Sequence, residues 1–178
     1  MYMTFFIHQF DNSILQFIQN NMHGYIMDKL MILVTSLGDM GIIWIAIAIL
    51  LIANKKYRHI GYMTVMAIIL GAVFGEVILK HIFQRPRPFI AVHTLNVLIS
   101  KPTSSSFPSG HTTAAFAAAG ILSECFKKYG VAFWILAVLI AFSRLYLYMH
   151  YPTDVMGGIA LGLICSRLTF YIFKRYEY

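Results

Sequence analysis

The chain has 178 residues, of which 59% are hydrophobic and only 12% carry a charge. A soluble domain usually carries about 25% charged residues, so this composition excludes a soluble globular protein. It indicates an integral membrane protein with one domain over residues 1–178. The formal net charge is +7, but the basic residues are scattered between apolar runs and form no stripe, so we expect no nucleic-acid partner.

The first 21 residues predict an amphipathic helix that lies in the membrane interface. Polar residues interrupt this stretch too often for it to cross a bilayer, and it lacks the basic start of a cleaved signal peptide. Its apolar residues recur at helical spacing, namely Phe6, Phe10, Ile14, Phe17 and Ile18, with Asp11, Asn12, Gln16 and Gln19 between them.

Five later apolar stretches predict an all-α bundle of about five to six transmembrane helices. The first is interrupted at Gly38, Asp39 and Gly41, so we expect this span to draw on residues before the break. The stretch before the third span is rich in proline and serine and predicts a loop over residues 81–107. The five stretches cover residues 28–53, 60–79, 108–126, 131–142 with an extension toward 149, and 154–173.

Basic residues indicate the orientation of these spans. Clusters at residues 55–58, 127–128 and 174–175 fall on one side if the spans alternate, and the positive-inside rule makes that side cytoplasmic. The opposite, extracytoplasmic face of the cell membrane then holds the 80–107 loop and the 145–153 connection. That face also carries cations, which we assign to a binding site rather than to topology: Lys80, Arg85, Arg87, Lys101 and Arg144.

Three short stretches on the outward face hold a polar cluster, over residues 80–88, 107–112 and 143–154. Charged residues at membrane depth cost roughly 2.5–3.5 kcal/mol each on insertion scales, so such a cluster predicts a functional site. Its cations, two histidines and one carboxylate suit a dianionic phosphate. Arginine can bind phosphate oxygens bidentately, and lysine adds a point charge.

The second stretch predicts a helix start that can hold an anion. Pro108 suits the first helical position, and Ser109 and Gly110 would then present free backbone N–H groups to the phosphate. Glycine also lets the phosphate approach the backbone closely. His111 falls in the first turn, where a proton donor to the leaving oxygen is needed.

The third stretch places a histidine four residues before an aspartate. Pro152 forbids a continuous helix through His150 and Asp154, but it can start the next helix with Asp154 in the first turn. From there Asp154 could accept a hydrogen bond from one nitrogen of His150. That bond would leave the other nitrogen as a nucleophile.

Together the three stretches resemble the type II phosphatidic acid phosphatase superfamily, which also includes the vanadium haloperoxidases. The family pattern is K-x6-RP, then PSGH, then SR-x5-H-x3-D. Residues 80–88, 108–111 and 143–154 match this pattern in order and spacing across about 75 residues. Arg87 fits the register of the first motif, whereas Arg85 lies two residues short of it.

The resemblance implies a helical membrane phosphatase that works through a phosphohistidine. In such an enzyme His150 would be the nucleophile, Asp154 its orienting partner and His111 the general acid. No metal or other cofactor is implied. The phosphate would be held by Lys80, Arg87, Ser109, the Gly110 amide and Arg144.

Small bacterial chains of this family act on undecaprenyl pyrophosphate or phosphatidylglycerol phosphate. We expect hydrolysis of undecaprenyl pyrophosphate to undecaprenyl phosphate, because the predicted site faces outward and the chain shows no extra head-group domain. Phosphatidylglycerol phosphate and phosphatidic acid are the alternatives. The expected partners are therefore a lipid phosphate and the bilayer.

Other interpretations stay open at this stage. A haloperoxidase would hold vanadate with the same residues, although those relatives are soluble, and a silent membrane protein would be expected to lose His150 or His111. A zinc site would need a ligand pattern such as HExxH, which the sequence lacks. Glu76 is expected to pair with Lys80 one helical turn later, with head-group contact as the alternative. Residues 104–106 predict a loop with a helix cap rather than chemistry.

Overall fold

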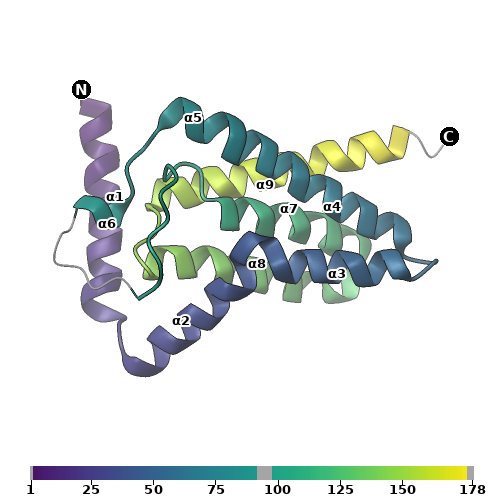
Figure 1. Ribbon diagram of the computed structural model, residues 1–178, viewed down its shortest axis with the longest axis horizontal. Coiled ribbons are helices and arrows are strands. Elements are labelled where there is room, and N and C mark those ends of the chain that lie inside the picture. The colour runs from purple at the N-terminus through teal and green to yellow at the C-terminus, as the bar shows by residue number, and fades with distance from the viewer. Residues whose placement is uncertain (1, 92–97, 176–178) are drawn as a thin grey trace.

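The computed structural model describes the backbone of residues 2–91 and 98–175 and the side chains of residues 6–90 and 98–173. Within these ranges the regular structure is helical, and Figure 1 shows a bundle of helices with one helix lying across its end. The elements are α1 (Tyr2–Asn21), α2 (Tyr25–Gly38), η1 (Asp39–Gly41), α3 (Ile42–Ala53), α4 (Arg58–Ala72), η2 (Val73–Leu79), α5 (Lys80–Phe83), α6 (Pro88–Ala91), α7 (Gly110–Cys125), η3 (Lys127–Tyr129), α8 (Gly130–Tyr146) and α9 (Pro152–Arg175).

Four helical stretches of the described chain are long and apolar enough to cross a membrane, namely Tyr25–Ala53, Arg58–Ile90, Lys127–Tyr146 and Pro152–Phe173. They correspond to four of the predicted spans. The remaining predicted span is α7, whose 16 residues fall short of the roughly 20 that a perpendicular crossing needs. It lies inside the bundle and packs against α4, α8 and α9. The protein is therefore a multi-pass helical membrane protein.

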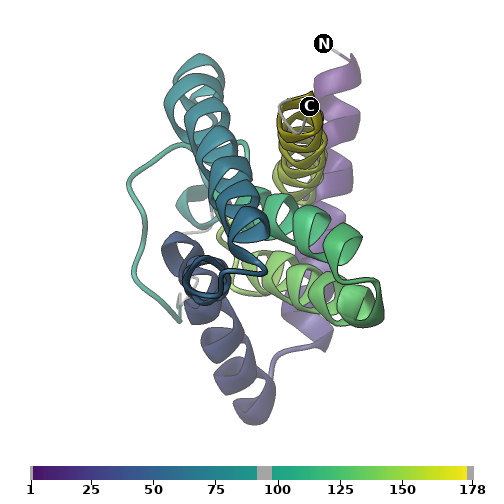
Figure 2. The ribbon, with the colours of Figure 1, turned by 90° about the vertical axis from the view of Figure 1, so that its right-hand side faces the viewer.

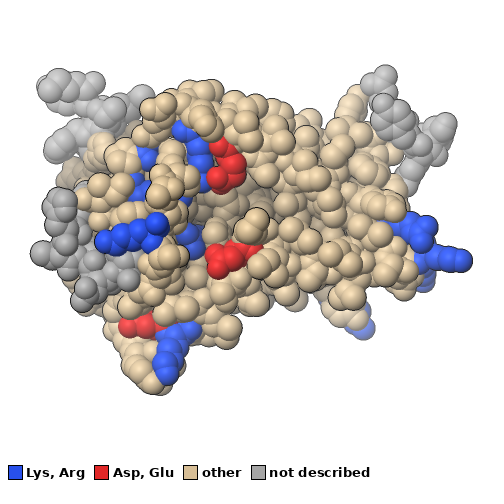
Figure 3. All heavy atoms as spheres, viewed as in Figure 1, with Lys and Arg blue, Asp and Glu red and all other residues tan. Residues whose placement is uncertain are grey.

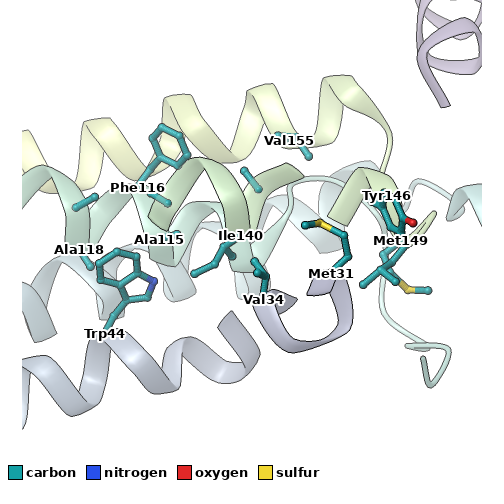
Figure 4. Packing of buried hydrophobic residues seen from close by; sticks show 14 of the residues in the cluster. Met31, Val34, Trp44, Ala115, Phe116, Ala118, Ile140, Tyr146, Met149 and Val155 are labelled. Atoms are coloured by element: carbon teal, nitrogen blue, oxygen red, sulfur yellow. The ribbon is translucent and has the colours of Figure 1, made fainter. Parts of the chain in front are cut away.

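Small residues allow α7 to occupy the centre of the bundle. Ala115 and Ala118 are fully buried, and Figure 4 shows Trp44 of α3 pointing toward this part of α7. On the other side, a Cβ at Gly162 of α9 would lie 2.6 Å from the carbonyl oxygen of Thr113. Any side chain at Gly162 would therefore push α9 away from α7, and both helices begin at the site described below.

The first membrane stretch is broken where the sequence predicts. Helix α2 ends at Gly38 and α3 begins at Ile42, and between them Met40 and Gly41 have φ angles of 51° and 71°. The left-handed conformation costs a residue with a side chain roughly 1–2 kcal/mol. Met40 is 89% exposed, so burial of its side chain does not offset this cost. The break turns Asp39 out of the helix and toward α7.

The second span is longer than predicted and contains a π-helical segment. Helix α4 continues through η2 into α5, so the helical path extends to Phe83. Such π-helical turns are rare and occur frequently at functional sites. Here η2 carries Glu76, and α5 begins with Lys80, at the edge of the site.

Helix α1 lies across the end of the bundle where α6 and the α8–α9 connection are found (Figures 1 and 2). It buries Leu15 and Ile18 against the protein. A second face of the helix is apolar and exposed, as a helix in the membrane interface requires. The exposed aromatic residues on that face are Phe6, Phe10 and Phe17.

The opposite end of the bundle gathers two connections and the end of the last helix. The α3–α4 turn, the α7–α8 connection and the end of α9 lie together there (Figures 1 and 2). The sequence predicts that the basic clusters share one side, and the backbone segments that carry them lie at this one end (Figures 1 and 2). The polar cluster predicted to bind phosphate lies toward the α1 end.

Candidate active site

The three polar stretches meet in one cavity of about 450 Å³. Figure 3 shows the surface hollowed between groups of basic and acidic atoms. The outer part of the cavity is apolar and includes Met40, Ile68 and Ala114. Six of the eight predicted site residues line it, and Ser109 and Asp154 do not. The polar lining consists of Glu76, Lys80, Arg87, Ser104, His111, Arg144 and His150, together with Gly110.

His150 has one ring nitrogen fixed and the other beside a cation. Its Nδ1 lies 2.8 Å from the Ser106 carbonyl oxygen, which can only accept, so Nδ1 carries the proton. Its Nε2 lies 3.3 Å from Arg87 Nη1, which can only donate, so Nε2 presents its lone pair. Burial lowers the pKa of His150 to about 3, which keeps the ring neutral. The geometry therefore leaves Nε2 as the ring nitrogen that presents a lone pair to the cavity.

Asp154 lies in the first turn of α9 as predicted, but it does not bond directly to His150. The distance from Asp154 Oδ2 to His150 Nδ1 is 3.8 Å, which is too long for a hydrogen bond. The carboxylate instead accepts the Ser106 hydroxyl at 2.5 Å and the Tyr151 backbone N–H at 2.9 Å. An acidic residue at the third helical position commonly reaches back to this N–H. The expected direct bond is thus replaced by a link through Ser106.

Arg85, which lies outside the motif register, is a second partner of Asp154. Its guanidinium donates to Asp154 at 2.6 Å and to Asp11 at 2.6 Å, and it lies over the Tyr151 ring at 4.1 Å. The sequence pattern groups Asp11 with the polar residues of an interfacial helix, yet its side chain is fully buried. It also accepts the backbone N–H of Thr153 at 3.0 Å, so α1 caps α9. A buried carboxylate needs such pairing.

Three buried cations face the cavity with few carboxylates to balance them. Lys80, Arg87 and Arg144 are only 6%, 4% and 2% exposed. Lys80 pairs with Glu76 at 2.7 Å, which confirms that prediction. Arg144 donates to Thr35 Oγ1 at 2.5 Å, but its Nε has no partner among the described residues. An unpaired buried donor costs about 1–3 kcal/mol, so an anionic ligand would stabilise this arrangement.

The PSGH stretch starts α7 with two differences from the prediction. The helix begins at Gly110, so Pro108 precedes it and does not take the first helical position. The Ser109 N–H donates to the Asp154 carbonyl oxygen at 3.1 Å, so it is not free to bind an anion. Gly110 does line the cavity. A Cβ there would lie 2.3 Å from Glu76 Oε1, so glycine is what lets an anionic oxygen come so close.

Ser104 belongs to the site, contrary to the prediction that this serine run has no chemical part. Its hydroxyl oxygen lies 3.3 Å from Lys80 Nζ and 3.0 Å from Arg87 Nη2. Its carbonyl oxygen accepts a hydrogen bond from Arg87 Nε at 2.7 Å. Ser104 therefore sets the positions of two cations that would hold the phosphate.

We expect Ser104→Ala to raise KM for a lipid phosphate about tenfold, because a hydrogen bond to a charged group contributes about 1.5–3 kcal/mol. Initial rates over a range of substrate concentrations measure this effect. Ser105→Ala is the matched control, since within the described part of the chain the Ser105 hydroxyl hydrogen-bonds to the Arg85 carbonyl, at 3.4 Å, and to no cation. Equal effects from the two variants would show that the substitutions change the conformation of the loop, and that the contacts of the Ser104 hydroxyl with Lys80 and Arg87 do not matter for KM.

His111 lies in the first turn of α7 and lines the cavity, as predicted. Its Nε2 is 2.7 Å from Oδ1 of Asp39, in the break between α2 and α3. The sequence marks Asp39 only as an interruption of an apolar run. A charge in such a position is the one signal that could have pointed to it.

Comparison with known proteins places this geometry in a family. Residues 60–178, which contain all three motifs, match the PAP2 superfamily. The chain belongs to the PAP2 superfamily. This membership confirms the predicted resemblance, and with the relatives below it identifies a phosphatase that acts on lipids.

Two relatives of this PAP2 protein are undecaprenyl-diphosphatases. BcrC of Bacillus subtilis is 34% identical over 149 residues, which cover 83% of this chain and 76% of the relative. The Sulfolobus acidocaldarius enzyme is 37% identical over 131 residues, which cover 71% of this chain and 62% of that one. The crystal structure of Aquifex aeolicus LpxE has a TM-score of 0.79 at 30% identity, covering 90% of this chain and 94% of that one.

The PAP2 match begins at residue 60, which explains part of what sequence motifs miss. Asp11, Thr35 and Asp39 all lie before it. Each contacts a residue of the matched region, and none belongs to a motif. The N-terminal helices therefore complete the site with side chains that only the folded chain brings close.

Proposed function

We propose that this PAP2 protein removes a phosphate from a membrane lipid through a phosphohistidine formed at Nε2 of His150. The arrangement of His150 carries the proposal: Nδ1 is held by a carbonyl oxygen, and Nε2 opens toward Arg87 in a cavity rich in cations. A neutral imidazole with a free lone pair beside a bound phosphate is ready for attack.

The proposed reaction consists of two displacements. His150 Nε2 first attacks phosphorus, and the bond to the leaving oxygen breaks as that oxygen takes a proton from His111. Water then attacks the phosphohistidine and gives its proton to His111, and inorganic phosphate leaves. Throughout, Lys80, Arg87 and Arg144 offset the charge on the phosphoryl oxygens. These groups supply nucleophile, acid and charge stabilisation, so we propose a metal-independent reaction.

We propose undecaprenyl diphosphate as the substrate, with undecaprenyl phosphate as the product. Two undecaprenyl-diphosphatases among the relatives support this choice. The apolar outer part of the cavity suits a lipid chain that stays in the bilayer while its phosphate reaches the cations. The basic clusters at the opposite end support an extracytoplasmic site in the cell membrane.

In detergent with EDTA, we expect the protein to release phosphate fastest from undecaprenyl diphosphate in a panel that includes phosphatidylglycerol phosphate and phosphatidic acid. Malachite-green detection of phosphate measures each rate. Loss of activity on adding EDTA would overturn the metal-independent mechanism. A preference for either glycerolipid would overturn the substrate, and release from no lipid would overturn the function.

A further inference from the structure

Asp39 and His111 form a contact that no motif contains. Asp39 Oδ1 lies 2.7 Å from His111 Nε2 across 72 residues of sequence. The contact depends on the break between α2 and α3, where Met40 and Gly41 adopt left-handed backbone conformations. Without this break Asp39 would continue the helical path of α2 and would not turn toward α7.

The imidazole of His111 is held on two of its atoms. Its Cδ2 would lie 3.0 Å from a Cβ built on Gly38, so the ring edge packs against the backbone of α2. Its Nε2 is taken by Asp39. Nδ1 has no hydrogen-bond partner among the described residues, and His111 lines the cavity. Nδ1 is therefore the nitrogen available to a substrate.

Asp39 is the group that favours a protonated His111 against its surroundings. Burial and the cations Arg144 and Arg87 lower the pKa of His111 to about 4, whereas the hydrogen bond and the charge of Asp39 act in the opposite direction. Asp39 is the carboxylate in hydrogen-bond contact with the ring. The other ionisable groups that line the cavity around His111 are Glu76, Lys80 and His150.

We propose that Asp39 is the positioning residue that holds the His111 ring through Nε2 and directs its Nδ1–H at the leaving oxygen. The inference rests on the proposed function. In the first displacement the Nδ1 proton of His111 passes to the leaving oxygen as the P–O bond breaks and the P–N bond to His150 forms. In the second, neutral His111 takes a proton from the attacking water as the P–N bond breaks. Asp39 keeps its hydrogen bond to the Nε2–H of His111 in both steps and stabilises the imidazolium.

This role predicts a dependence on the leaving group that a structural role would not produce. An alkoxide is a poor leaving group and needs the proton in the transition state, whereas a nitrophenolate leaves readily without it. The phosphate monoester that leaves an isoprenoid diphosphate also needs little help, because its second pKa is about 6. Replacing Asp39 should therefore lower kcat/KM for an alkyl phosphate more than for a nitrophenyl phosphate or a diphosphate.

The test compares Asp39→Asn with the wild type on octyl phosphate, on a nitrophenyl phosphate that carries the same octyl chain, and on undecaprenyl diphosphate. We expect kcat/KM to fall about 10- to 100-fold on octyl phosphate and less than about threefold on the other two. Asp39→Glu, which retains the carboxylate, should keep part of the octyl phosphate activity. Glu124→Gln is the matched control, since Glu124 pairs with Lys127 at the far end of the bundle.

Asp39→Asn should fold normally, because the Asp39 side chain is 55% exposed and an exposed pair contributes little to stability. An equal loss on all three substrates would make Asp39 structural and overturn the inference. A wild type that cleaves the nitrophenyl ester and the diphosphate but not octyl phosphate would also overturn it, since no effective proton donor would exist. A wild type that cleaves none of them would overturn the proposed function instead.

Discussion

His150→Ala is expected to lower the rate of phosphate release by on the order of 10⁴-fold or more, because loss of a covalent nucleophile removes the whole double-displacement route. The variant should remain folded, because the hydrogen bond between Ser106 and Asp154 does not involve the imidazole that is removed. Phosphate release from undecaprenyl diphosphate in detergent measures the effect. His8→Ala, at an exposed position on α1, is the matched control.

The covalent intermediate gives this prediction a second readout. Rapid quenching of the wild type with substrate should trap phosphate on Nε2 of His150, because Nδ1 is bonded to the Ser106 carbonyl. ³¹P NMR of the quenched protein distinguishes the two nitrogens. Phosphate on Nδ1, or full activity in His150→Ala, would refute the assignment of the nucleophile.

The buried Arg144 and the half-buried Arg85 should have different effects on activity and on stability. Arg144→Met is expected to lower kcat/KM by about 10²–10³-fold, as removal of one charge-stabilising donor does in other enzymes. Its melting temperature should change little, because the Arg144 guanidinium contacts no carboxylate of the described residues and its Nε is unpaired. Arg85→Met should instead cost about 3–5 kcal/mol of stability, because it leaves Asp11 and Asp154 buried without their cation.

Thermal unfolding in detergent, with and without orthovanadate, measures both effects. Orthovanadate should raise the melting temperature of the wild type by binding the folded state, and it should fail to do so for Arg144→Met. If Arg144→Met unfolded as easily as Arg85→Met, Arg144 would be a structural residue. If orthovanadate still stabilised Arg144→Met fully, Arg144 would not belong to the phosphate site.

Much of the fold follows from local patterns. Apolar length predicts the spans, and the helix start at Pro152 follows from the missing N–H and fixed φ of proline. The break after Gly38 is also visible, because glycine and a charge interrupt an apolar run. Helix α7 is the exception, since its 16 residues do not satisfy the length of a span. Its place in the bundle depends on close packing against other helices.

The identity of most cavity residues also follows from the sequence, because three motifs in fixed order and spacing are unlike a chance arrangement. The partners of these residues do not follow from it. Pro108 and Ser109 differ from the prediction because the turn before α7 packs against α9, where the Asp154 carbonyl takes the Ser109 N–H. Arg85 is excluded by the motif register, yet it bonds to the same Asp154 as Ser106.

A helical membrane protein with a cluster of cations and histidines suited to phosphate follows from the sequence, because hydropathy, helix breakers and motif spacing are all properties of the linear chain. Which atoms come into contact depends on the folded chain. Ser106 stands between Asp154 and His150, Arg85 joins α1 to α9, and Asp39 reaches His111. Each of these contacts joins segments far apart in sequence, and a shift of about 1 Å separates a hydrogen bond from none. No pattern along the chain carries information at that scale.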